Sequence, residues 1–126
     1  MKHLLLSAAA LFLLVTLSSC AHHVAAEDER IVIEPSAQQM LAITDLAIGE
    51  INGGFQRVTL TASNRMSHAY HFEYNVQWFR DDNTPIESIL TRPERFTLDP
   101  GAAIFIKFVS PTPEATNFKA QFRCLD

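Results

Sequence analysis

Residues 70–79 have the sequence YHFEYNVQWF, and this stretch decides the fold class. Every second residue is aromatic or aliphatic, and the residues between them are polar until the end of the stretch. Because successive side chains of a strand point to opposite faces, this period of two predicts a β-strand with one buried and one solvent-facing side. The predicted buried side is Phe72, Tyr74, Val76 and Trp78, and the wet side is His71, Glu73, Asn75, Gln77 and Phe79.

Two apolar runs precede this strand, and Asn52-Gly53-Gly54 separates them. Asn-Gly between two such runs predicts a hairpin, because both residues tolerate positive φ. The second run extends from Phe55 to Ser63. The first has two interpretations. Residues 36–39 have the form of a capping box, so residues 37–47 could be helical, but we favour a strand over residues 42–51.

Short runs with turn residues between them also follow the central strand. The turn residues are Asp81-Asp82-Asn83, Asp99-Pro100-Gly101 and the segment Ser110 to Pro113. This spacing predicts an all-β fold, an immunoglobulin-like β-sandwich of about seven strands packed around Trp78. The predicted later strands are residues 86–90, 95–98, 103–109 and a last strand with Phe118, Ala120, Phe122 and Cys124 on its apolar face.

The N-terminal residues predict export. Lys2 is followed by an apolar run from Leu4 to Leu17. The run is shorter than the ~20 residues that a membrane-spanning helix needs. A basic start, a short apolar run and a small-residue exit are the parts of a secretory signal peptide. We therefore expect residues 1–19 to be a cleaved signal peptide.

The exit sequence Leu17-Ser18-Ser19-Cys20 resembles the lipobox of bacterial lipoproteins. A thiol can form a stable thioether with diacylglycerol, and cleavage before Cys20 frees its amine for a further acyl chain. Each buried CH₂ contributes ~0.8 kcal/mol, so several chains hold a protein firmly at a membrane. The resemblance implies lipidation of Cys20 on the periplasmic face of a bacterial membrane. Resemblance to lipoprotein sorting patterns also implies that Ala21, in place of an aspartate, favours the outer membrane over the inner.

The rest of the chain is long enough for one domain. Removal of residues 1–19 leaves 107 residues, and the net charge of −4 becomes −5 without Lys2. This acidic balance, with no cluster of Lys or Arg, argues against nucleic acid as a partner. We expect residues 20–38 to be the lipidated N-terminus and a flexible tether, in which residues 31–33 could add a short strand. Residues 39–126 are expected to be the sandwich domain.

Three segments carry a family resemblance: RVTLTASN (residues 57–64), HFEYNVQWFRDD (71–82) and FTLDPGA (96–102). Together they resemble the YcfL-like family of small bacterial lipoproteins, over roughly residues 40–126. The resemblance implies a single sandwich domain behind a lipobox, with no assigned biochemical function and no catalytic residues to carry over. The chain departs from the family pattern at the turn after Trp78, where Asp82-Asn83 replaces an expected Asp-Gly.

The wet side of the central strand is the candidate partner-binding surface, comprising His71, Glu73, Gln77 and Phe79 together with Phe105. Phe79 and Phe105 each break a polar pattern on their own strand. If they share one outer sheet face, they form an exposed aromatic patch of the kind that marks partner sites. If they face a second packed layer, they belong to the core.

Catalytic and metal-binding interpretations are weaker. His22, His23, His68 and His71 do not predict convergent metal ligands, and Asp81 to Asn83 lack the glycine and glutamate of a calcium loop. With Cys20 lipidated, Cys124 has no partner for a disulfide within the chain, and we expect it to behave as a small buried hydrophobe. We predict no metal, no cofactor and no enzyme activity.

The sequence therefore predicts a non-enzymatic envelope lipoprotein whose sandwich binds another envelope protein or cell-wall material. An anchored β-sandwich with edge strands available for pairing fits that role. The alternative is a small-molecule or metal-binding envelope module.

Overall fold

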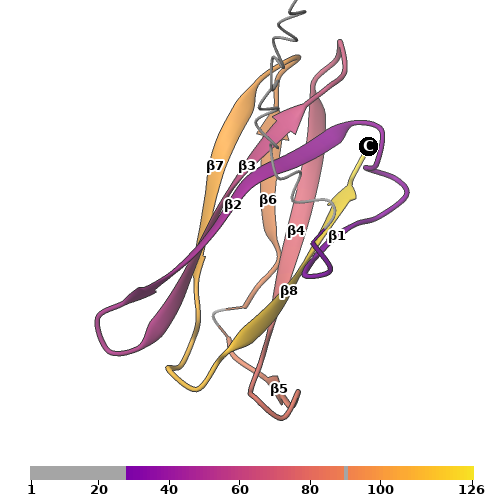
Figure 1. Cartoon of the computed structure of the whole chain (residues 1–126). Helices are drawn as coiled ribbons and strands as arrows, with labels where there is room; N and C mark the ends of the chain where they lie inside the picture. The colour runs from indigo at the N-terminus through magenta and orange to yellow at the C-terminus, as the bar shows by residue number, and fades with distance from the viewer. Residues whose placement is uncertain (1–27, 90) are drawn as a thin grey trace, which may run out of the picture.

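The computed structural model describes residues 28–89 and 91–126. In this part of the chain the fold is all-β, with eight strands in two sheets and no helix, so none that could span a membrane (Figure 1). The predicted β-sandwich is confirmed, with eight strands where about seven were expected. The strands are β1 (Ile31–Ile33), β2 (Leu41–Ile51), β3 (Phe55–Asn64), β4 (Tyr70–Phe79), β5 (Pro85–Ile86), β6 (Glu94–Leu98), β7 (Ala103–Val109) and β8 (Asn117–Cys124).

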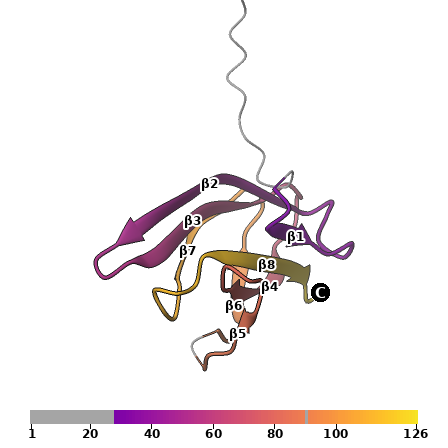
Figure 2. The same cartoon turned by 60° about the horizontal axis from the view of Figure 1, so that its bottom comes forward.

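The sheets have three and five strands. The smaller sheet has the order β2-β3-β7, and in the larger sheet β4 lies between β8 and the two short strands β5 and β6, with β1 beyond β8. The consecutive strands β3 and β4 lie in different sheets, and β7 and β8 return to pair with β3 and β4. Figure 2 shows the two layers, with β2, β3 and β7 above and β8, β4 and β6 below. Such crossing connections are those of an immunoglobulin-like sandwich.

The core lies between the two layers, and aromatic side chains pack among its more numerous aliphatic residues. Trp78 on β4 is fully buried, as the alternation predicted. The centroid of its ring lies 5.4 Å from that of Phe118 on β8. It lies 6.0 Å from that of Phe108 on β7, across the sandwich. Such tilted and edge-on ring pairs contribute ~0.5–1.5 kcal/mol each beyond the area that they bury.

Residues 41–51 form a strand, so the strand interpretation is confirmed and the helical one is wrong. The β2–β3 ladder has a bulge between Thr44 and Ala47, where Asp45 adopts a φ of 56°. The predicted hairpin closes at Ile51 and Phe55. Positive φ falls on its two glycines, Gly53 and Gly54, rather than on Asn52.

The expected strand over residues 86–90 is largely wrong. Among residues 85–89, only Pro85–Ile86 pair with β4, and Ile89 is 81% exposed. The side-chain amide of Gln77 donates to the carbonyl of Ile86 at 3.1 Å, where the ladder stops. The preceding turn has Asn83 at a φ of 63°, a left-handed conformation that asparagine tolerates better than most residues.

The folded part of the chain begins earlier than residue 39. Ile31–Ile33 pair in parallel with β8, and Ala37 is fully buried. The structure thus places residues expected in the tether against the edge of the larger sheet. Residues 1–27, with the predicted signal peptide and Cys20, lie outside the described residues.

Candidate functional site

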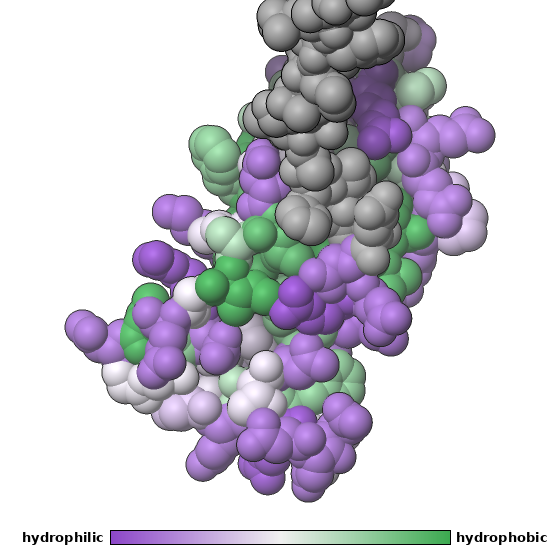
Figure 3. Space-filling view, in the orientation of Figure 1, coloured by the Kyte–Doolittle hydropathy of each residue, from purple (hydrophilic) through white to green (hydrophobic). Residues whose placement is uncertain are grey.

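The candidate site is the outer face of the larger sheet, which carries the wet side of β4. Opposite residues in an antiparallel pair share a face, so the register decides which side chains join it. On one side of β4, Glu73 lies opposite Arg123 and Asn75 opposite Gln121, both on β8. On the other side, Glu73 lies opposite Arg95 of β6. Figure 3 shows one side of the whole molecule, in the orientation of Figure 1, where hydrophilic residues predominate and hydrophobic residues lie in patches between them.

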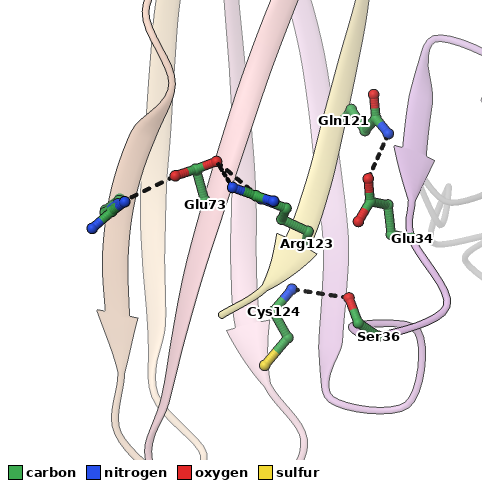
Figure 4. Close-up of polar contacts among 7 residues, drawn as sticks. Glu34, Ser36, Glu73, Gln121, Arg123 and Cys124 are labelled. Atoms are coloured by element: carbon green, nitrogen blue, oxygen red, sulfur yellow. Dashed lines mark hydrogen bonds and ion pairs between the residues drawn. The ribbon is translucent and has the colours of Figure 1, made fainter. Parts of the chain in front are cut away.

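Glu73 is not the exposed polar residue that the sequence predicted. Its side chain is only 10% exposed, because two arginines from the neighbouring strands cover it. Arg123 donates to Oε1 through Nε at 2.9 Å and through Nη2 at 2.7 Å, while Arg95 Nε donates to Oε2 at 3.2 Å. Figure 4 shows Glu73 with partners on both sides. These three residues, here called the arginine triad, link β6, β4 and β8.

The triad sets the protonation state of its carboxyl. The hydrogen bond from Arg123, and then that from Arg95, lower the pKa of Glu73 below its usual value, against the opposing effect of burial. Glu73 is therefore ionised at neutral pH. An acid–base catalyst needs a pKa near the working pH, so this carboxylate is suited to holding two guanidinium groups rather than to transferring protons.

A concavity of about 180 Å³ adjoins the triad. Glu73 and Asn75 of β4 line it, together with Gln121 and Arg123 of β8. Glu34, which directly follows β1, also lines it. The side-chain amide of Gln121 donates to Oε1 of Glu34 at 2.7 Å (Figure 4). Glu34 reaches this face because its own N–H donates to the carbonyl of Phe122 at 2.9 Å, directly after β1.

His71 remains exposed on the same face and binds Asp126. The backbone N–H of His71 donates to Oδ2 of Asp126 at 2.7 Å, and Nδ1 lies 2.9 Å from Oδ1. The backbone N–H, and then the imidazole, lower the pKa of the Asp126 carboxyl. These hydrogen bonds hold Asp126, which follows β8, against the start of β4.

Phe79 and Phe105 do not share an outer sheet face, so the aromatic patch, one of the two alternatives for these residues, does not form. Phe79 is half-buried at the end of β4 and lines a separate concavity of about 280 Å³ with Arg30 and Asn83. Phe105 is 83% exposed, but on β7, which belongs to the smaller sheet. The two rings therefore lie on different layers of the sandwich. Gln77, the remaining predicted residue, donates to two backbone carbonyls.

Cys124 is free in the described structure and half-buried against the core, while its N–H donates to Ser36 Oγ at 3.2 Å (Figure 4). Among residues 28–89 and 91–126, no three His, Cys, Asp or Glu side chains lie together as a metal ion would require. Cys20, His22 and His23 lie outside the described residues.

The sequence predicted part of this site. Alternation placed Glu73 on the outer face of its strand. The apolar face predicted for the last strand, from Phe118 to Cys124, leaves Gln121 and Arg123 on the opposite face of that strand. Alternation missed Arg95 and Glu34. No pattern within one strand shows which residues of another strand lie opposite, and β1 pairs in parallel with a strand at the other end of the chain.

Comparison with known proteins shows the fold. No family model matches the chain, and no curated protein matches it either. A DUF1425 family member from Shewanella sp. pv-4 is similar with a TM-score of 0.60 and 14% identity, over 66% of this chain and 76% of that one. This chain shares its fold with that DUF1425 protein. The Campylobacter jejuni protein cj0090 is similar with a TM-score of 0.63 and 12% identity, over 75% of this chain and 97% of that one.

At these identities the similarity to the DUF1425 protein concerns the sandwich alone. The similarity does not extend to the arginine triad or to the concavity beside it.

Proposed function

We propose that this protein is a YcfL-like lipoprotein of the bacterial envelope, non-enzymatic, whose sandwich binds another envelope protein or cell-wall material. The outer face of the larger sheet is the proposed binding surface. The observation that carries the proposal is the arginine triad with its adjoining concavity. Fixed charges and amide groups converge there, and the two arginines keep the carboxylate of Glu73 ionised.

The anchor is the second part of the proposal. The sequence Leu17-Ser18-Ser19-Cys20 supports lipidation at Cys20 and placement on the periplasmic face, with Ala21 favouring the outer membrane. Because β1 begins at Ile31, only residues 21–30 connect the lipidated cysteine to the first strand. Even fully extended, ten residues reach no more than about 35 Å. The proposed partner therefore lies near the membrane surface.

The fold similarity to a DUF1425 family member supports the family part of the proposal. The segments that resemble the YcfL-like family cover most of β3 and β4, including Glu73.

The anchor is tested by metabolic labelling with a fatty acid in cells expressing the wild-type protein or Cys20→Ser. We expect label and membrane fractionation for the wild-type protein and loss of both for the variant. An unlabelled wild-type protein in the soluble fraction would refute lipidation.

The binding surface is tested by photo-crosslinking in intact cells. A crosslinking residue at Asn75, in the outer face of the larger sheet, is compared with one at Thr59, in the smaller sheet. We expect discrete crosslinked products from position 75 and few from position 59. Equal crosslinking at both positions, or none at position 75, would contradict the proposed surface.

A further inference from the structure

The concavity beside the arginine triad carries both signs of charge. Glu34 accepts one hydrogen bond, from the neutral amide of Gln121. Within the described part of the chain its second oxygen, Oε2, has no partner. A carboxylate has about four acceptor positions, and its strongest partners are cationic donors. Glu34 can therefore accept a positively charged group that enters the concavity.

Arg123 supplies the opposite charge. Its Nε and Nη2 are both used on Glu73, whereas Nη1 has no partner among residues 28–89 and 91–126. Since Arg95 also binds Glu73, the triad has two positive charges and one negative. Glu73 fixes the plane of the Arg123 guanidinium, and a fixed guanidinium is the preferred protein partner of a carboxylate.

Because the concavity has a negative charge at Glu34 and a positive charge at Arg123, it favours a ligand that carries both a positive and a negative group. A simple anion placed against Arg123 would meet the carboxylate of Glu34, and a simple cation at Glu34 would meet the net positive triad. A ligand that carries an ammonium and a carboxylate a few ångströms apart satisfies both sides. Asn75 and Gln121 add neutral amide groups to the same wall, and the volume of about 180 Å³ suits a single small head group.

We propose that this concavity binds a zwitterionic α-amino-acid group, with Glu34 receiving the ammonium and Arg123 the carboxylate. The group has two possible sources in the envelope: a free amino acid, or the unlinked end of a diamino acid in a cell-wall peptide. The second source rests on the proposed envelope location, whereas binding of the group itself does not.

The test is an NMR titration of the full-length protein in detergent, following the side-chain amides of Asn75 and Gln121. The probes are D-alanine, L-alanine, acetate and methylammonium. We expect saturable shifts with at least one alanine enantiomer and a Kd in the millimolar range, as suits a shallow polar site. We expect acetate and methylammonium each to bind at least ~10-fold more weakly, since each makes one of the two ionic contacts.

Matched variants assign the contacts. Glu34→Gln and Arg123→Gln should each weaken alanine binding at least ~10-fold. Glu50→Gln and Arg57→Gln, which make the same changes on exposed residues of β2 and β3, should leave it unchanged. The unfolding midpoint of each variant is measured alongside. Because Arg123→Gln also disturbs the triad, Glu34→Gln is the decisive variant: it can keep a hydrogen bond to Gln121 while losing the charge.

Two results would overturn the proposal: acetate binding as tightly as alanine, or no saturable shift with alanine and with a soluble cell-wall peptide alike. The sources are separated by two peptides, one with its diamino-acid end free and one with that end cross-linked. Tighter binding of the free-ended peptide than of alanine indicates the cell wall, and equal binding indicates the free amino acid. If the NMR titration shows no binding but position 75 still gives discrete crosslinks in cells, the proposed function is retained and only this ligand is rejected.

Discussion

The side-chain amide of Asn64 donates a hydrogen bond of 3.0 Å to the carbonyl of Leu98. Asn64 ends β3 in the smaller sheet and Leu98 ends β6 in the larger one, so this bond joins the two layers. The same amide donates to the carbonyl of His68 at 2.7 Å, and its oxygen accepts the N–H of Met66 at 2.8 Å. A buried asparagine with these three bonds explains why the strand ends in this residue type.

Asn64→Ala is expected to lower the free energy of unfolding by about 1–3 kcal/mol, because the buried carbonyl of Leu98 loses its donor. Urea unfolding followed by Trp78 fluorescence measures the change. Asn117→Ala, at an exposed position, serves as the control and should change stability by less than about 0.5 kcal/mol. Equal effects of the two substitutions would show that the bond between the layers contributes nothing.

Phe122 and Phe105 provide a second comparison, since one phenylalanine is fully buried and the other is 83% exposed. Phe122→Ala should cost about 3–5 kcal/mol, through lost burial and the cavity that remains. Phe105→Ala should cost less than about 0.5 kcal/mol. Thermal unfolding of both variants checks this pair, and a large loss with Phe105→Ala would mean that this ring is covered in solution.

The arginine triad predicts a pH-dependent contribution to stability. The folded pKa of Glu73 is below its ordinary value of 4.5, so its contribution is present above pH 4.5 and is lost as the pH falls through the folded pKa. Glu73→Gln should therefore be less stable than the wild-type protein at neutral pH, with a difference that shrinks below pH 4.5. Urea unfolding midpoints from pH 7 to pH 3 measure this difference.

Glu50→Gln is the control for this titration, because Glu50 is exposed and forms no ion pair with the described residues. Its stability difference from the wild-type protein should stay flat over the same range. A flat difference for Glu73→Gln would contradict the lowered pKa. High salt should also reduce the Glu73→Gln effect, since both arginines are partly exposed, 75% for Arg95 and 50% for Arg123.

The backbone conformation of the turn after β4 predicts which of two substitutions at Asn83 lowers the stability more. At a φ of 63°, Asn83→Ala should lose about 1 kcal/mol, because alanine lacks the short polar side chain that lets asparagine tolerate the left-handed conformation. Asn83→Gly should be within about 0.5 kcal/mol of the wild-type protein, because glycine adopts this φ freely. Chemical unfolding of the two variants gives the ordering, and a more stable Asn83→Ala would contradict it.

Local sequence patterns predicted much of the fold, because strand alternation and turn residues reflect the backbone preferences of neighbouring residues. The bounds of β4 and β7 agree with the alternation, and Asp99-Pro100-Gly101 forms the expected turn, with a φ of 68° at Gly101 and a 3.0 Å bond from Ala102 N–H to Asp99. The segment after Ile86 was predicted poorly. Its apolar residues suggested a strand, but β6 takes the adjacent edge of β4.

The sequence by itself determined where the chain is extended, where it turns and which side of each strand is apolar, because these follow from the steric preferences of neighbouring residues. Only the tertiary structure decided which strands share a sheet and in which register. That choice separated Phe79 from Phe105, enclosed Glu73 between Arg95 and Arg123, and brought Glu34 beside Gln121. Pairings between distant segments depend on the packing of the whole core, which no single strand encodes.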